Sequence, residues 1–403
     1  MAEENEPGSK TDSNPPDFPL FDEGSLFGLE RSPARRWFDR FTLWQQIMIV
    51  VSVTWIPLAV LAAIQGVAVD LELDLAHLSF FEDAAIYARF FVALPILLAT
   101  PSKCRYRFQQ LIQHFLNSGL VKDTDRERFV VILTSTMRLR YSHVADWVCL
   151  AIAYGRSAAL VFHPAVALAN SAAWRTIGPA GLRSLSLAMW YFVVVSQPVF
   201  GFVALHFLYR VCLWWRTLWM ISRLDLQLKG SHPDGGGGLM FLALSLARFK
   251  WPAFALATSL AGGTANLVLA TGVSVLSFKY VIILNAAIIS ALFAGPLCLF
   301  YGQLKRTKVR DLLSYDRVAQ EQLRQFEQNW IERSRQTDML QVQDFSAVID
   351  LNSTVDKVHQ MRPLPFRRNQ LLELLAAALL PFLPVLAMQI PIKDLFMMLK
   401  ELI

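Results

Sequence analysis

Charged residues are scarce in this chain of 403 residues. Lysine, arginine, aspartate and glutamate together make up 17% of it, whereas hydrophobic residues make up 54%. Typical soluble domains carry about 25% charged residues, so the composition argues against a soluble fold. It predicts an all-α, polytopic transmembrane helix bundle with amphipathic helical extensions in the cytoplasm.

The sequence also has few cysteines and lacks the common catalytic motifs. The four cysteines, at positions 104, 149, 212 and 298, form no CxxC pair and no spacing typical of a zinc site. The sequence has no GxSxG elbow and no HExxH pair. We therefore predict no enzyme activity, no metal site and no cofactor.

The first thirty residues have little that can form a core. Eight acidic side chains lie there among Pro, Gly and Ser: Glu3, Glu4, Glu6, Asp12, Asp17, Asp22, Glu23 and Glu30. This composition predicts a disordered acidic tail over residues 1–40, with a basic end next to the membrane. The early apolar stretch of a secretory signal is missing as well.

Long uncharged runs, by contrast, are abundant. Each approaches the roughly 20 residues that a helix needs to cross a bilayer. Six spans are predicted, at 43–65, 80–100, 144–166, 186–209, 251–273 and 278–301, and a weaker seventh at 371–392 spans, re-enters or lies along the surface. The predicted organisation is a bundle over 41–304 with helical loops at 103–142 and 210–238, a cytoplasmic helical segment at 305–369, and a C-terminal hydrophobic segment at 370–403.

Basic residues flank the predicted spans on one side. Four arginines precede the first span and three basic residues follow the second, whereas the loop between these spans carries only acidic charges: Arg31, Arg35, Arg36 and Arg40, then Lys103, Arg105 and Arg107, against Asp70, Glu72 and Asp74. The positive-inside rule places the N-terminus in the cytoplasm. The net charge of +6 is then a topology signal, and no nucleic-acid partner is predicted.

An apolar stripe marks the charged segment from 305 to 335. It consists of Leu312, Ala319, Leu323, Phe326 and Trp330 at helical spacing. Packing on the other cytoplasmic helices is the favoured interpretation. A coiled-coil contact between subunits is the alternative.

Arginines at membrane depth are the strongest candidates for a ligand site. Arg156 lies near the centre of the third span, where a charge costs about 2.5–3.5 kcal/mol, so it should face protein or water. Arg89 lies in the outer half of the second span. We expect Arg156, Arg89, Gln197 and Asn285 to bind an anionic solute or a lipid headgroup; in the alternative, Arg156 only bonds to carbonyls or to the two amides.

Helix-breaking residues interrupt three predicted spans, at Gln197-Pro198, Gly262-Gly263 and Gly295-Pro296. Exposed backbone groups at such breaks can hold ions. Small residues also permit close helix packing, and this second interpretation is favoured.

The most distinctive string runs from Ser231 to Gly238 and reads SHPDGGGG. A Pro-Asp-Gly turn with a flexible hinge is the favoured interpretation, and a phosphate or headgroup contact by the loop amides is the alternative. The predicted cytoplasmic motif comprises Arg223, Asp225, His232, Asp234, Gly235, Gly237 and Arg362.

Three segments carry a family resemblance: HPDGGGGL, Arg223-Leu-Asp225, and the stretch from Asp350 to Phe366 with its Met361-Arg362-Pro363 core. They resemble an uncharacterised family of bacterial multi-pass inner-membrane proteins. The resemblance implies the bacterial inner membrane and no particular activity. It also implies that the two motif regions face the cytoplasm and meet in one patch.

Two functions remain open from the sequence. The preferred one is transport, or binding, of an anionic small molecule or lipid headgroup in contact with membrane lipids. The alternative is a membrane-anchored scaffold or sensor, whose helices at 103–142, 211–229 and 305–335 bind a partner protein or form a homo-oligomer.

Overall fold

The computed structural model describes residues 18, 20–21, 40–67, 79–162, 173–177, 184–328 and 342–388. In these ranges helix predominates, and strand is limited to the short pair β1 (Thr176–Ile177) and β2 (Ser184–Leu185). The all-α prediction is therefore confirmed.

In the part of the chain that the structure describes, seven helical stretches are long and apolar enough to cross a membrane, which makes the chain a multi-pass membrane protein. They are α2 (Leu43–Ile64); α3, η2 and α4 (Ala84–Tyr87, Ala88–Ala93, Leu94–Asn117); α6 (His143–Phe162); α8, η5 and α9 (Leu187–Tyr191, Phe192–Ser196, Gln197–Ile221); η6 and α10 (Met240–Leu242, Ala243–Thr271); η7 and α11 (Val275–Phe278, Lys279–Cys298); and α14, η9 and α15 (Arg368–Leu379, Leu380–Phe382, Leu383–Ala387).

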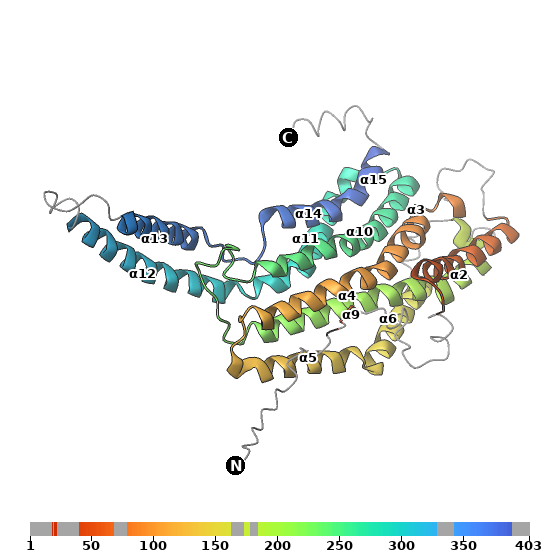
Figure 1. Cartoon of the computed structure of the whole chain (residues 1–403). Coiled ribbons are helices and arrows are strands. Elements are labelled where there is room, and N and C mark those ends of the chain that lie inside the picture. Colours follow the sequence, from red (N-terminus) through yellow and green to blue (C-terminus); the bar gives the residue numbers. More distant parts are fainter. Residues whose placement is uncertain are drawn as a thin grey trace, which may run out of the picture.

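The remaining elements lie at the two ends of this bundle (Figure 1). One end, called the motif side here, carries η3 (Asp123–Asp125), α5 (Arg126–Arg140), the loop 222–239, α12 (Tyr301–Phe326) and α13 (Val342–Gln360). The other end, called the far side, carries η1 (Phe80–Glu82), η4 (Ala173–Arg175) and the two strands.

Helix α10 is the centre of the bundle and packs against α14, α4, α3, η2 and α11. A side chain at Gly262 would place its Cβ only 2.5 Å from the Cβ of Ala88, so glycine is what lets α10 approach this close. At the neighbouring Gly263 nothing lies within 4 Å. The close-packing interpretation of the glycine pair is therefore right for Gly262.

Two of the spans share a local design that keeps them helical through a proline. Each starts with a capped short helix, in which Asp83 accepts from the Ile86 amide and Ser186 from the Met189 amide. A π-helical segment follows, η2 or η5, and the next helix carries its proline in the first turn. The wider π turn gives a proline ring room beside the preceding carbonyls. The expected interruption at Gln197-Pro198 is thus a π turn and not a break.

Several predicted boundaries are wrong because long helices run past the membrane. The second span continues to Asn117, so the predicted loop helix is an extension of α4. The helical stretch of the fifth span begins at Met240, and Lys250 within it pairs with Glu373 on α14 at 2.7 Å. The fourth ends at Ile221, and the predicted helix up to 229 is replaced by a loop. Residues 342–360 form α13, a separate helix within the segment 305–369 that was predicted as helical.

The apolar stripe of α12 packs on α13. Leu312 and Ala319 are half-buried, whereas Leu323 is 50% exposed. The favoured packing interpretation is confirmed for the first two residues, although α13 is a partner that the sequence reading did not foresee. Trp330 and the side chain of Phe326 lie outside the described residues.

The N-terminal segment contradicts the prediction of a fully disordered tail. Phe18, Leu20 and Phe21 are buried in the core. The Phe21 ring lies 4.3 Å from that of Phe108 on α4 and 6.0 Å from that of Phe249 on α10. Burial of these three apolar side chains stabilises their contact with the bundle, although the segment around them is acidic. The rest of the segment before Arg40 lies outside the described residues.

Candidate functional site

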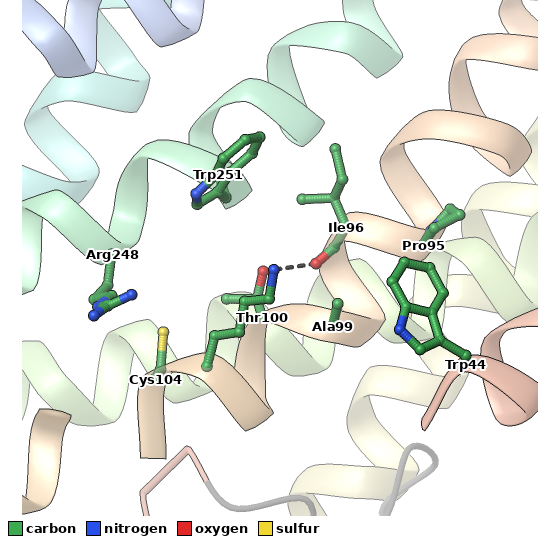
Figure 2. Close-up of a pocket in the computed structure, with 9 residues that line it drawn as sticks. Trp44, Pro95, Ile96, Ala99, Thr100, Cys104, Arg248 and Trp251 are labelled. Carbon is green, nitrogen blue, oxygen red and sulfur yellow. Dashed lines mark hydrogen bonds between the residues drawn. The ribbon is translucent and has the colours of Figure 1, made fainter. Parts of the chain in front are cut away.

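A pocket opens where the start of α2 meets α4 and α10 (Figure 2). Its volume is about 160 Å³. The lining residues are Trp44, Pro95, Ile96, Ala99, Thr100, Lys103, Cys104, Arg248 and Trp251.

The pocket has a gradient of polarity along the helix axes. On α4, Ile96 and Ala99 lie toward the bilayer and Lys103 lies about 10 Å beyond Ile96 toward the motif side, at 1.5 Å per residue. Helix α10 runs in the opposite direction, so Arg248 likewise lies closer to the motif side than Trp251. The cationic end therefore faces water and the apolar end faces the hydrocarbon.

Two positive charges define the aqueous end of the pocket. Lys103 is exposed and Arg248 is half-buried. Within the described residues neither has a hydrogen bond or an ion pair, and the lining includes no carboxylate. By contrast, Lys250 two residues further on is neutralised by Glu373 at 2.7 Å. Among the described residues, the pocket thus presents two cations with no carboxylate partner to an anion.

Two tryptophans frame the same pocket. Trp44 is 68% exposed and Trp251 is 59% exposed, so both indoles face the surroundings of the bundle. Tryptophan is enriched at the level of lipid headgroups, where its ring is apolar and its N–H finds a polar partner. Together with the adjacent cations, these rings place the pocket at the motif-side interface of the bilayer.

Arg156 does not occupy the predicted interior site. Its side chain is exposed on the outer face of α6. Helix α6 packs on α9 through the row of Cys149, Ala153 and Ser157, with Ala153 next to Gly201, and Asp146 Oδ1 lies 3.5 Å from His206 Nδ1. Arg156 follows Cys149 by seven residues and Ala153 by three, so it lies at the exposed edge of this row. The structure therefore does not bury Arg156 against protein, and water, the other surrounding expected for its charge, stays a prediction.

Within the described residues, no hydrogen bond joins the other predicted ligand residues to Arg156. Gln197 is buried in α9, and its Oε1 has no hydrogen-bond partner in the described part of the chain; the same holds for Nδ2 of Asn285 on α11. Arg89 is half-buried in η2 and interacts electrostatically with Asp83, Arg175 and Arg156. The four residues therefore do not form one bonded site.

A buried carboxylate closes the far side of the bundle. Asp83 is fully buried, and its oxygens accept hydrogen bonds from Trp174 Nε1 at 3.0 Å and from Asn266 Nδ2 at 2.6 Å. Arg175 lies 3.4 Å away as its ion-pair partner. The donors join η4 and α10 to the cap of α3. Protein groups thus satisfy the hydrogen bonds and the charge of the buried carboxylate. Its role is structural, because it holds these elements together.

The glycine-rich loop caps itself. The Asp234 carboxylate accepts hydrogen bonds from the amides of Gly236, Gly238 and Met240 at 2.8, 3.1 and 3.1 Å. Burial acts to raise the pKa of Asp234, but these amides and His232, whose Nδ1 lies 2.9 Å away, together lower the pKa below its ordinary value. Asp234 occupies the place that a phosphate would take, so the geometry fits the turn interpretation.

The two motif regions meet on the motif side. The Arg362 amide donates to the Gly235 carbonyl at 2.9 Å. Gly237 has a φ of 65°, and a Cβ there would lie 2.8 Å from Met361 Cε. Glycine is thus required both by the backbone conformation and by the close contact.

The upstream Arg-Leu-Asp segment extends the same assembly. Asp225 forms an ion pair with Lys122, and the Arg223 guanidinium lies 3.9 Å from the ring centroid of Trp219. The chain 120–122 also contacts the glycine loop, because a Cβ at Gly238 would lie 2.9 Å from Leu120 Cδ2. The predicted motif residues therefore build one packed junction between α4, α10, α12 and the chain after α13.

Sequence reasoning missed the residues of the interfacial pocket. In the sequence Lys103 serves only as a topology signal, and Arg248 lies just before the predicted fifth span at 251–273. Their shared depth next to exposed tryptophans was the available signal. Comparison of the chain with protein-family models, curated proteins and solved structures finds no match.

Proposed function

We propose that this protein resides in a bacterial inner membrane, with the motif side in the cytoplasm, and binds the anionic headgroup of a membrane lipid in the pocket between α2, α4 and α10. The observation that carries the proposal is that Lys103 and Arg248 both line the aqueous end of an otherwise apolar pocket. The excess of basic residues on this side supports its cytoplasmic placement.

The pocket suits an amphiphile better than a free anion. A phosphate bound between Lys103 and Arg248 would form charge-assisted hydrogen bonds, which are roughly twice as strong as neutral ones. The chain attached to that phosphate would continue toward Ile96 and Ala99, about 10 Å deeper. A small inorganic anion would use the cations and leave this apolar part of the pocket unfilled.

Thermal unfolding in detergent with added lipid tests the proposal. A ligand at 100 times its Kd stabilises the folded state by about 2.7 kcal/mol. We expect phosphatidylglycerol to raise the Tm more than phosphatidylcholine, and the Lys103→Gln/Arg248→Gln variant to lose the difference. The control Arg138→Gln/Lys229→Gln removes two exposed cations elsewhere and should retain it. An equal shift with both lipids in the wild-type protein would refute the headgroup selectivity.

A further inference from the structure

One face of α12 carries arginines at a regular spacing. Residues 306, 310, 313, 317, 320 and 324 follow one another at intervals of four and three, and all six are exposed: Arg306, Arg310, Leu313, Arg317, Gln320 and Arg324. This interval places the six side chains on one face of the helix. The row extends over about 27 Å at 1.5 Å per residue.

The opposite face of α12 is already occupied. Leu304 is fully buried, Lys308 donates to the carbonyls of His359 and Met361, and Asp311 accepts from the Gly230 amide at 2.7 Å. These contacts join α12 to α13 and to the loop before the glycine motif. Arg310 still reaches the Leu228 carbonyl of that loop at 3.4 Å, but the rest of the arginine face points away from these contacts. Figure 1 shows the two helices standing out from the end of the bundle as an arm.

The charges on this face are weakly compensated. Arg310 pairs with Asp311 at 2.9 Å and Arg324 with Glu321 at 3.1 Å, but both guanidinium side chains are 66% exposed. Exposed pairs of this kind contribute about 0–1 kcal/mol, so they exchange readily for another carboxylate. Arg306 and Arg317 have no hydrogen bond or ion pair to a described residue.

We infer that the arginine face of α12 is a docking surface for an acidic amphipathic helix of a partner protein. Arginine binds carboxylates through two parallel hydrogen bonds, which suits Glu or Asp at the matching interval. Leu313 is 66% exposed and Val309 is 51% exposed, and they offer apolar contacts between the charges. The inference uses residues that the lipid pocket does not contain and so goes beyond the proposed function.

Other occupants fit this face less well. A second copy presenting the same face would bring arginine against arginine, and such like-charge contacts oppose pairing. A nucleic acid would engage the arginines but gain nothing from the exposed Leu313. A bilayer around the spans would not reach Arg324, which lies near the tip of the arm, about 27 Å beyond Arg306.

Fluorescence anisotropy with the full chain in detergent tests the inference. The probe is a synthetic helical peptide with Glu at alternating three- and four-residue intervals and Leu between them; a second peptide has the same composition in scrambled order. We expect the first to bind at least about tenfold more tightly, and Arg306→Gln/Arg317→Gln to weaken it by at least about tenfold, the equivalent of 1.4 kcal/mol. The control Arg138→Gln/Arg368→Gln should leave its Kd unchanged.

Three outcomes would overturn the inference. These are equal binding of the ordered and scrambled peptides, an unchanged Kd in the Arg306→Gln/Arg317→Gln variant, and tighter binding of a single-stranded RNA of matched charge than of the ordered peptide. A second variant, Leu313→Ser, distinguishes packing from net charge. It should weaken the ordered peptide and leave the salt dependence of binding as in the wild-type protein.

Discussion

Asp234 accepts a hydrogen bond from the amide of Met240 at 3.1 Å and thereby closes the glycine loop onto the start of the fifth span. Two further loop amides bond to the same carboxylate. The negative charge sits at the N-terminal end of η6 and α10, where the helix dipole favours it. The loop is therefore a preformed junction that sets where α10 begins.

Replacement of Asp234 should weaken this junction. In Asp234→Asn the amide retains one acceptor oxygen, so part of the amide set loses its partner, at a cost of about 1–3 kcal/mol in unfolding free energy. Thermal unfolding in detergent measures the loss. The matched control is Asp225→Asn, because the exposed pair with Lys122 contributes less than about 1 kcal/mol. Equal losses in both variants would contradict the capping role of Asp234.

The same carboxylate predicts an acid-sensitive junction. Because its folded pKa is lowered below 3.8, the unfolded state binds the proton more tightly. The stabilisation is fully present above the ordinary pKa and is lost as the pH falls through the lower folded value. Melting curves from pH 6 down to pH 3 should therefore show a loss of stability that is smaller in Asp234→Asn. An equal loss of stability with falling pH in the wild-type protein and in Asp234→Asn would contradict this role of the Asp234 carboxylate.

Gly262 should tolerate no side chain, unlike its neighbour. Gly262→Ala places a methyl group 2.5 Å from Ala88 Cβ, and overpacking of this kind costs about 1–3 kcal/mol. Gly263→Ala meets open space and should be neutral or stabilising by up to about 1 kcal/mol. The Tm of the two variants in the same detergent checks the contrast. If both substitutions act alike, α10 and α3 are not in the close contact described.

Phe21 should hold the N-terminal segment on the bundle. Its ring lies against Phe108 and Phe249. Truncation of a buried Phe costs about 3–5 kcal/mol in unfolding free energy. A terminal segment can undock without unfolding the bundle, so the loss here is limited to the free energy of undocking that segment. We expect Phe21→Ala to speed proteolytic cleavage between residues 21 and 40. The control Phe162→Ala alters a ring that is 80% exposed and should leave the cleavage rate unchanged. Wild-type rates in Phe21→Ala would show that Phe21 does not anchor the segment.

The sequence was sufficient to predict the helical spans, whereas the contact between the two motif regions was expected only from the family resemblance. Runs of about 20 apolar residues are dictated by bilayer thickness, so α2, α6 and α11 were found within a few residues. Glycines at a turn restrict the backbone locally, which made Gly235 and Gly237 visible.

The candidate site was less predictable because it depends on which side of a helix faces which neighbour. Arg156 stands out in the sequence only because it lies near the middle of a predicted span. The one-sided packing of α6 leaves it outside the core. Lys103 and Arg248 are 145 positions apart and meet only because α4 and α10 pack together. Phe21 shows the converse, since a short apolar patch within an acidic stretch carries no periodic signal.

Native mass spectrometry with equimolar phosphatidylglycerol and phosphatidylcholine tests the central proposal most directly. We expect the wild-type protein and Arg138→Gln/Lys229→Gln to retain phosphatidylglycerol in preference to phosphatidylcholine. In Lys103→Gln/Arg248→Gln, loss of a charge-assisted contact worth about 1.5–3 kcal/mol should reduce that preference at least tenfold. An unchanged preference in the folded Lys103→Gln/Arg248→Gln variant would contradict the assignment of the pocket as a headgroup site.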